Sequence, residues 1–385
     1  MPTKSNISMA STAVNDTRNT SSESKKSLLQ VGSSFIHRIQ SSTFMGPKHF
    51  NINIQLLDDL ENVQGYFKKT STGQDVLDFV CKELNIIEKE YFGLRYNDKH
   101  RYWVDLSSPL SKMFTTSNVA LSFRVRFYPT DLNAIKEEVT RYNLFVQLQR
   151  DLSHGRLQCN QTESIKLAAL ILQVEQGDFD EERHLPGYVS EFKLLLRQSS
   201  RIEEKIAEHH KELRSMSSEV AMNEFLKECV SLQTYGVNPY TVTIGKNQTN
   251  VVVGASSSRI IVFVMNQCVY TIEWRYVQAI DYSGKHLKIV IKPTYFSEHL
   301  KEHPDLAPEA ALSKVVGSTL FAEDLKPTKS DKKMQLKFNC PSSTFAKHLW
   351  RDLLSQQVFF HEDAAKNVKL RFFKGDLLDL NDCLQ

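Results

Sequence analysis

The sequence predicts an α+β protein of several lobes, because the period of its apolar residues changes twice along the chain. Residues 50–129 hold short runs in which apolar and polar residues alternate, as in half-buried strands. Residues 130–234 switch to the 3.6-residue period of amphipathic helices. Residues 235–360 return to alternation and finish with one helical segment. We therefore expect three lobes, each with its own core, in a chain whose 385 residues suggest two or three domains.

The first lobe, 50–129, is predicted to be a small sheet with one helix. It opens with the strand FNINIQL, 50–56, whose four apolar residues alternate with polar ones. After a turn at Asp58 and Asp59, we expect a strand near 64–69, a helix from Gly73 to Leu84 and strands near 91–96, 101–105 and 119–127. This order resembles the small roll of ubiquitin.

Charged residues of the first lobe raise a question about their environment. The run LSFRVRFYP, 121–129, alternates, so we expect its apolar residues to face the core and Arg124 and Arg126 to face the other way. Water or a neighbouring lobe is the expected environment of these two guanidinium groups, and bound phosphate is the alternative. Glu88 and Glu90 are expected to be solvated, with docking of a basic peptide as the alternative.

The second lobe, 130–234, is predicted to be an all-helical bundle. Its second helix is expected to begin after Asn160, where Glu163 completes a capping box, and to end at Gly177. Further helical segments are expected near 188–194, from Ile202 to Leu213 and near 218–234. The first helix is expected from about residue 131, with an apolar stripe of Leu132, Ile135, Val139, Tyr142 and Val146.

The third lobe, 235–360, is predicted to be a sandwich of seven strands closed by a helix at 342–360. The strands are expected near 240–245, 250–255, 259–265, 268–274, 278–283, 286–292 and 333–339. This plan is typical of pleckstrin-homology (PH) and phosphotyrosine-binding (PTB) domains. Between the last two strands lies an insert, 294–333, whose length is uncommon in a compact domain and points to a function or to disorder.

The two ends of the chain differ from the lobes. Residues 1–49 are rich in Ser, Thr and Asn and hold six basic and two acidic residues, which predicts a disordered leader. Phosphorylation of this leader, or contact with anionic lipid, is the alternative to a plain flexible segment. Residues 361–385 are expected to form a tail after the last helix.

The composition argues against several classes of protein. A net charge of +3, from 48 basic and 45 acidic residues, argues against a protein that coats nucleic acid. No stretch approaches the roughly 20 apolar residues of a membrane span, and the first residues lack the apolar core of a signal peptide. The six cysteines are scattered without zinc-ligand spacing, as in a cytosolic protein with reduced thiols.

The sequence lacks a recognisable catalytic constellation. No cysteine is followed six residues later by an arginine, the arrangement in which a tyrosine phosphatase cradles phosphate, and no Gly-rich phosphate loop occurs. His209 and His210 are adjacent on a predicted helix, so their rings point about 100° apart and do not favour a shared metal. We therefore expect no enzymatic activity, no cofactor and no bound metal.

Eight ordered segments carry a resemblance to a known family. They are EKEYFGLRY (88–96), FRVRFYP (123–129), RYNLFVQLQRDLSHGRLQC (141–159), QGDFD (176–180), YVSEF (188–192), LQTYGV (232–237), EWRYV (273–277) and HLWRDLL (348–354). Together they resemble the FERM module of the band 4.1 superfamily, more closely its band 4.1 and FERM-domain-containing branch than ezrin, radixin and moesin. Two departures are Arg275, where this branch usually has proline, and the insert 294–333.

The resemblance implies a fold and a role. It implies a helical middle lobe like acyl-CoA-binding protein, and a non-catalytic adaptor or scaffold between the plasma membrane and the cytoskeleton. The implied location is cytoplasmic, at the cytoskeleton and the inner face of the plasma membrane. Implied partners are membrane phosphoinositides, cytoplasmic tails of transmembrane receptors and cytoskeletal or cortical proteins, not nucleic acid. The alternative is the regulatory portion of a longer protein, such as a non-receptor tyrosine phosphatase whose catalytic domain is missing from this chain.

Two lysine clusters are candidate lipid sites under this resemblance. HLKIVIK places Lys288 and Lys292 on one face of a strand, with Lys285 in the adjoining turn. Lys68 and Lys69 of the first lobe form the second cluster. Clustered lysines suit phosphoinositide headgroups as point charges. Ordinary surface lysine is the alternative.

A peptide site is implied at the fifth strand of the third lobe. In PTB-like domains an extended peptide adds to this strand beside the closing helix. The alternative is that the helix residues only close the core of the lobe. The candidate residues are Gln278, Ala279, Ile280, Asp281, Tyr282, Phe345 and Leu349, with Leu353 and Gln356 further along the helix.

Overall fold

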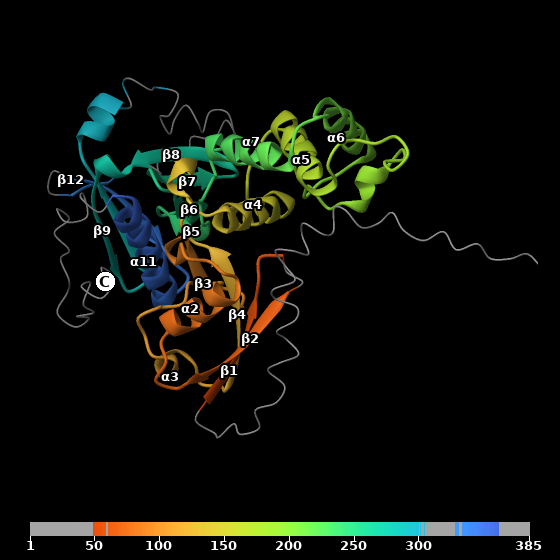
Figure 1. Cartoon of the computed structure of the whole chain (residues 1–385). Coiled ribbons are helices and arrows are strands. Elements are labelled where there is room, and N and C mark those ends of the chain that lie inside the picture. The colour runs from red at the N-terminus through yellow and green to blue at the C-terminus, as the bar shows by residue number, and fades with distance from the viewer. Residues whose placement is uncertain are drawn as a thin grey trace, which may run out of the picture.

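The computed structural model describes residues 49–58, 61–299, 328–330 and 333–361, together with the single residues 301 and 304. Three lobes are visible in Figure 1: a small sheet with its helices, a helical lobe, and a strand-rich lobe beside one long helix. This arrangement confirms the predicted α+β fold of a ubiquitin-like roll, a helical bundle and a PH-like sandwich with a terminal helix. The leader predicted at 1–49 and the tail predicted at 361–385 lie, but for one residue each, outside the described residues, as does most of the predicted insert.

The first lobe is a four-stranded sheet in the order β2-β1-β4-β3, with β1 and β4 parallel at its centre. Its elements are β1 (His49–Gln55), β2 (Asn62–Lys68), α2 (Gly73–Glu83), β3 (Phe92–Tyr96), α3 (Leu110–Met113) and β4 (Asn118–Val125). The strand predicted at 101–105 is wrong, because this stretch makes a single bridge from Trp103 to Arg95. Arg101 has a left-handed φ of +52°, which breaks an extended conformation at that point.

Strand β4 is buried on both faces from Leu121 to Val125, so Arg124 does not lie in water, one of the two environments expected for it. The strand lies between β1 and β3, and α4 (Glu138–Ser153) of the second lobe packs against it. The Arg124 guanidinium donates to the backbone oxygens of Leu56 and Phe123 at 2.6 and 2.7 Å. It therefore binds the end of β1 inside the first lobe. Arg126, just past the strand, is partly exposed.

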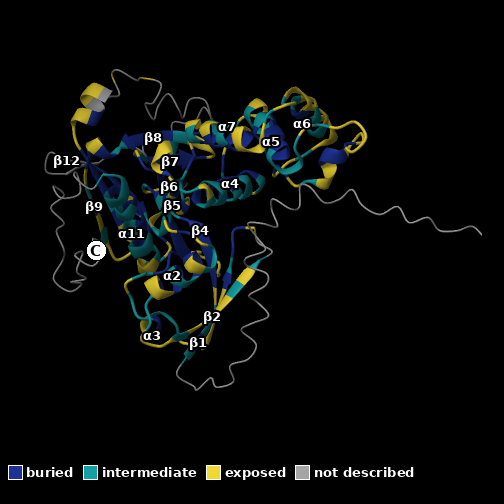
Figure 2. Ribbon diagram, viewed as in Figure 1, coloured by how far each residue is buried: buried dark blue, intermediate teal, exposed yellow. Residues whose placement is uncertain are grey.

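The second lobe is built around α5 (Gln161–Gln176), which α6 (Ser200–Glu212) and α7 (Ser218–Ser231) cover. The predicted capping box is confirmed: Asn160 Oδ1 accepts the Glu163 N–H at 2.9 Å, and the Glu163 carboxylate accepts the Asn160 N–H at 2.7 Å. The helix ends as predicted, at Gly177 with a φ of +75°. Exposed residues gather on α6 and its neighbouring loops (Figure 2). Short 3-10 turns occupy Leu132–Ala134 and Tyr188–Glu191.

The first helix of this lobe starts later than predicted and turns a different face inward. Only a 3-10 turn precedes Glu138, where α4 begins. Leu132 and Ile135 lie before the helix, so they share no helical face with the residues that follow. The rest of the predicted stripe is only half-buried. The fully buried apolar residues of α4 are Leu144, Phe145, Leu148 and Leu152.

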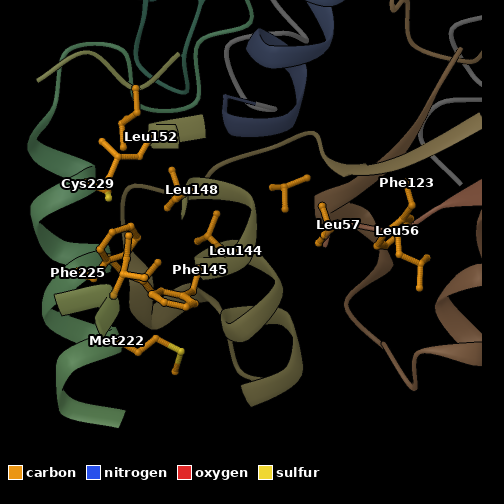
Figure 3. Close-up of a cluster of buried hydrophobic side chains, with 14 of the residues drawn as sticks. Leu56, Leu57, Phe123, Leu144, Phe145, Leu148, Leu152, Met222, Phe225 and Cys229 are labelled. Carbon is orange, nitrogen blue, oxygen red and sulfur yellow. The ribbon is translucent and has the colours of Figure 1, made fainter. Parts of the chain in front are cut away.

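The first and second lobes share one core, where we expected separate cores. Their buried apolar side chains form one continuous cluster. Figure 3 shows part of it, from Leu57 of the first lobe to Leu144 and Phe145 of α4 and Phe225 of α7. The third lobe has a second, distinct cluster. The first two lobes are therefore one packing unit, with the third docked onto it.

Two glutamates join the backbone of the first lobe to that of the second. Glu137 Oε2 accepts the N–H groups of Ile87 and Glu88 at 2.9 and 2.7 Å. In return, the Glu88 carboxylate accepts the N–H groups of Lys136 and Glu137 at 2.9 and 3.0 Å. Hydrogen bonds to an ionised acceptor are about twice as strong as neutral ones, so this reciprocal pair fixes both segments. The expectation that Glu88 is merely solvated is therefore wrong.

The third lobe is a sheet in the order β8-β7-β6-β5-β12-β10-β9, closed by α11 (Ser343–Phe360). The helix buries Ala346, Leu349 and Leu353 in the core of the lobe, as its predicted apolar side requires. The strands are β5 (Tyr240–Ile244), β6 (Thr249–Ala255), β7 (Arg259–Val264), β8 (Gln267–Glu273), β9 (Val277–Ser283), β10 (His286–Ile291), β11 (Thr328–Ser330) and β12 (Lys333–Asn339).

The described ends of the insert are anchored to this lobe. A π-helical turn at Tyr295–His299 begins the insert, and the buried Tyr295 hydroxyl donates to Thr271 O at 3.2 Å. At the other end, β11 pairs with β12. The insert therefore leaves the sheet and returns to it through structured segments.

Helix α11 also attaches the third lobe to the first. The His348 ring stacks on Tyr102 with centroids 4.0 Å apart and planes 4° apart. Next to this stack, Arg351 pairs with Asp105 at 3.0 Å. Further along the helix the interface includes contacts of Phe359 with Phe127 and Tyr91. One helix thus fills the core of the third lobe and holds that lobe against the first.

Replacing Glu137 with Gln tests the reciprocal glutamate pair. The change removes the negative charge from the acceptor of the Ile87 and Glu88 N–H groups, so we expect the free energy of unfolding to fall by about 1–3 kcal/mol in urea denaturation. Glu138→Gln, at an exposed neighbouring position, is the matched control and should change it by less than about 0.5 kcal/mol. Equal stabilities of the two variants would contradict the role of Glu137.

The stacked His348 predicts a pH dependence of stability. Burial, reinforced by the charges of Arg351 and Lys347, lowers the pKa of His348 to about 4. An unfolded histidine has a pKa of about 6.5, so the unfolded state binds more protons between these values. The contribution of His348 is therefore complete above about pH 6.5 and is lost as the pH falls toward the folded pKa.

His348→Phe keeps a stacked ring and removes the titration. Proton uptake on unfolding near pH 5.5 should drop by about one proton, measured as a flatter dependence of unfolding free energy on pH. Val220→Phe, at a side chain that is 54% exposed and does not titrate, is the control and should keep the wild-type slope. A wild-type slope in His348→Phe would rule out the buried, neutral imidazole.

Candidate functional site

Strand β9 offers an open edge of the third-lobe sheet. Among the described strands it pairs with β10 alone, through a two-residue hairpin turn whose first position is Gly284, with a φ of +56°. Ser283 and His286 close such a turn as a hydrogen-bonded pair. Antiparallel pairs alternate, so Ile280, opposite Ile289, lies in a pair without mutual hydrogen bonds. The N–H and C=O of Ile280 therefore point to the open edge, where an added strand binds.

Trp350 of α11 covers part of this edge. Its indole N–H donates to Ile280 O at 2.8 Å, and its ring lies 5.2 Å from that of Tyr282. Leu354, one turn further along the same side of α11, is also partly buried. A peptide that pairs with β9 along its whole length needs the same carbonyl oxygen. Trp350 therefore competes with such a peptide for the edge.

The five strand residues predicted for the peptide site all lie on β9. Ile280 is buried and Tyr282 contacts Trp350, so both point toward α11. Ala279 and Asp281 alternate with them and point to the opposite face. Gln278, near the start of the strand, is exposed. The five predicted residues thus lie together along one strand edge, but their side chains point to two opposite faces of the sheet.

The helix residues predicted for the same site face elsewhere. Leu349, like Leu353, is buried in the core of the third lobe. Phe345 packs against Tyr102 of the first lobe, and Gln356 donates to a backbone oxygen of that lobe at 3.1 Å. Trp350, which forms the wall beside β9, is not among the predicted residues. The sequence contains one signal for this residue: Trp350 directly follows Leu349. Successive residues of a helix point about 100° apart, so the residue after a core residue points away from the core.

Part of the predicted lysine cluster lies together on the outer face of the sheet. Lys288 sits opposite Asp281 of β9 on one side and Lys337 of β12 on the other. Its neighbours on β10 are buried, so Lys288 and Lys337 point away from the core, and Lys285 is exposed in the adjoining turn. We call Lys285, Lys288 and Lys337 the basic face. Lys292 lies beyond the end of β10, where its Nζ donates to a backbone oxygen of the β8–β9 connection at 2.6 Å.

Other predicted features lie outside these two surfaces. Lys68 and Lys69 are exposed at the end of strand β2 in the first lobe. In the part of the chain that the structure describes, no three His, Cys, Asp or Glu side chains gather as they do around a metal ion. The same residues include no helix with the length and apolar content that crossing a bilayer requires.

Three family models match the chain in the order of its lobes. They are the FERM N-terminal domain over residues 54–116, the FERM central domain over 130–240 and the FERM C-terminal PH-like domain over 245–368. Human Protein 4.1 is 34% identical over 250 residues, which are 64% of this chain and 29% of that protein. Mouse Band 4.1-like protein 4A is 30% identical over 324 residues, which are 82% of this chain and 42% of that protein. The chain spans less than half the length of these curated relatives.

Solved structures share the three-lobed fold. The FERM and C-terminal domain complex of Drosophila Merlin matches with a TM-score of 0.62 at 18% identity, covering 83% of this chain and 99% of that one. A MyTH4-FERM MF2 domain of Dictyostelium myosin VII matches with a TM-score of 0.56 at 13% identity, covering 85% of this chain and 64% of that one. These likenesses concern the fold alone. With the three family models and the Protein 4.1 relatives, however, they leave one conclusion: the chain belongs to the band 4.1 superfamily of FERM-domain proteins.

Proposed function

We propose that this chain is the ligand-binding module of a non-catalytic adaptor that links the plasma membrane to the cortical cytoskeleton. The observation that carries the proposal is the β9–β10 hairpin, which has an open strand edge beside α11 and shares the basic face with the neighbouring strand β12. Its ligands are membrane phosphoinositides and the cytoplasmic tails of transmembrane proteins, and cytoskeletal or cortical proteins are its further partners. The protein acts in the cytoplasm, at the inner face of the plasma membrane.

The basic face supports only weak binding to lipid by itself. Each lysine near an anionic surface contributes about 1 kcal/mol, and Asp281 beside Lys288 offsets part of the sum. The three lysines therefore contribute roughly 2–3 kcal/mol to the binding free energy. Micromolar affinity corresponds to a binding free energy of about 8 kcal/mol. Stable attachment to a membrane needs further contacts, for which Lys68 and Lys69, Lys292 and a membrane-embedded partner are the candidates.

The edge of β9 supplies such a contact through a receptor tail. Main-chain hydrogen bonds to an added strand give affinity that depends little on sequence, and side-chain contacts give selectivity. A tail that emerges from the membrane and a lipid headgroup are presented by the same surface. Binding one then raises the effective concentration of the other, so two weak contacts combine into a stable one.

A second candidate is the regulatory portion of a longer enzyme, such as a non-receptor tyrosine phosphatase. The observation that favours a longer protein is that the chain spans under half of its curated relatives. Phosphatase activity of the complete gene product, assayed on a phosphotyrosine peptide, distinguishes this candidate from the adaptor.

Charge reversal of the basic face tests the lipid part of the proposal. We expect Lys285, Lys288 and Lys337 changed together to Glu to lower binding to phosphoinositide vesicles at least about tenfold in co-sedimentation, because attraction becomes repulsion. A control triple with the same change of charge uses exposed lysines of the second lobe, Lys193, Lys205 and Lys227. If the Lys285, Lys288 and Lys337 variant pellets with vesicles like wild type, the basic face is not the lipid site. Adding Lys292→Glu to this variant shows whether Lys292 contributes to binding.

Truncation of Trp350 tests the tail part. Trp350→Ala frees the Ile280 carbonyl, so tail peptides that add to β9 should bind about threefold to tenfold more tightly, the value of one neutral hydrogen bond. Amide NMR shifts of β9, titrated with a panel of receptor-tail peptides, give both site and affinity. Thr344→Ala, exposed at the start of the same helix, is the control. Weaker binding by Trp350→Ala would mean that the indole is part of the peptide site and not its competitor.

A further inference from the structure

A small cavity lies where the three lobes meet. Its volume is about 30 Å³, and a water molecule needs about 10–15 Å³, so it has room for about two waters or one small ion. All three lobes contribute residues to its wall. The polar residues used below are Arg95, Trp103, Arg126, Asp151, Arg156 and Asn238.

The wall of this cavity carries more positive than negative charge. Three guanidinium groups line it, against the single carboxylate of Asp151. That carboxylate is already shared: it accepts the Tyr128 hydroxyl at 3.1 Å and the Gln147 amide at 3.1 Å, and lies 3.8 Å from Arg156. Asp352, behind the wall, is held by the Asn238 amide at 2.9 Å. Counting both carboxylates, the site still has a net positive charge.

Two donors in the wall have no acceptor within the described structure. They are Nε of Arg95 and Nε1 of Trp103, both out of contact with solvent. Arg95 is otherwise well placed, since its Nη2 donates to Asn238 Oδ1 at 2.7 Å and its guanidinium lies 4.0 Å over the Trp103 ring. An arginine stays protonated in proteins, and burying an unsatisfied donor is unfavourable. These N–H groups belong to residues of the wall, and with the three guanidinium groups they favour an anionic occupant that accepts hydrogen bonds.

We propose that this cavity binds a phosphate group, held by Arg95, Arg126 and Arg156 with the indole N–H of Trp103. Planar guanidinium groups match the oxygens of phosphate, which makes arginine the usual partner of a buried phosphate. The small volume excludes a ring-bearing ligand as a whole. The occupant is inorganic phosphate or one phosphate group of a larger molecule. Because each lobe supplies part of the wall, the bound anion connects all three lobes. The site is separate from the basic face and does not depend on the proposed membrane role.

Titration of the full chain with inorganic phosphate tests the proposal. At constant ionic strength, with chloride replacing phosphate, we expect a saturable shift of the Trp103 indole N–H signal and a rise in the unfolding temperature that chloride does not produce. Soluble inositol trisphosphate and phosphoinositide vesicles are the further arms. A shift with inorganic phosphate identifies the free ion, and a shift with inositol trisphosphate alone identifies a headgroup. No saturable shift in any arm would mean that the cavity holds only water.

Variants locate the binding. Arg156→Gln and Arg95→Gln should each weaken phosphate about tenfold to hundredfold, the value of a charge-assisted hydrogen bond. Arg197→Gln, at an exposed arginine of the second lobe, is the matched control and should bind like wild type. The Arg156 side chain is 28% exposed, so its variant keeps the test decisive if Arg95→Gln does not fold. Wild-type affinity in Arg156→Gln would overturn the assignment and place the anion elsewhere.

Discussion

Helix α11 constrains the whole arrangement, because three of its sides are engaged at once. One side places Leu349 in the core of the third lobe. A second sets His348 against the first lobe, and the third holds Trp350 on the edge of β9. A helix engaged on three sides moves only if several of these contacts change together. A peptide that displaces Trp350 therefore acts on the element that also holds two lobes together.

The first two lobes are held together by different interactions. Their shared apolar core brings them together, and the Glu88–Glu137 pair orients them, because its hydrogen bonds run from carboxylates to backbone N–H groups. Apolar contact is non-directional, whereas these bonds fix a register. The third lobe lacks such a shared core and is held by stacked rings and by the Arg351–Asp105 pair. The third lobe is thus attached without a continuous apolar core shared with the other two.

Periodicity predicted the elements well and their surroundings poorly. It located the seven third-lobe strands and the Asn160 capping box, because these depend on local alternation and on residues three apart. It did not predict that Arg124 binds the end of β1 inside the first lobe, or that Phe345 contacts Tyr102, a residue far away in the sequence. Trp350 is a functional candidate only through its bond to Ile280, 70 positions away. Such pairings join residues that are distant in the sequence. The position of Trp350 directly after Leu349 indicates only that its side chain points away from the core.

The two proposed ligand surfaces of the third lobe are coupled by sharing one hairpin. Lys288 and Asp281 lie on its outer face, whereas Ile280 presents its edge, so a lipid and a peptide require different atoms. They do not compete, yet each restrains the same two strands. Under the proposed function, any ordering of β9 by one ligand need not be repeated by the other, so we expect each ligand to favour binding of the other. Linkage then requires the two effects to be equal: the proposed lipid raises the affinity for the proposed tail by the same factor by which the tail raises the affinity for the lipid.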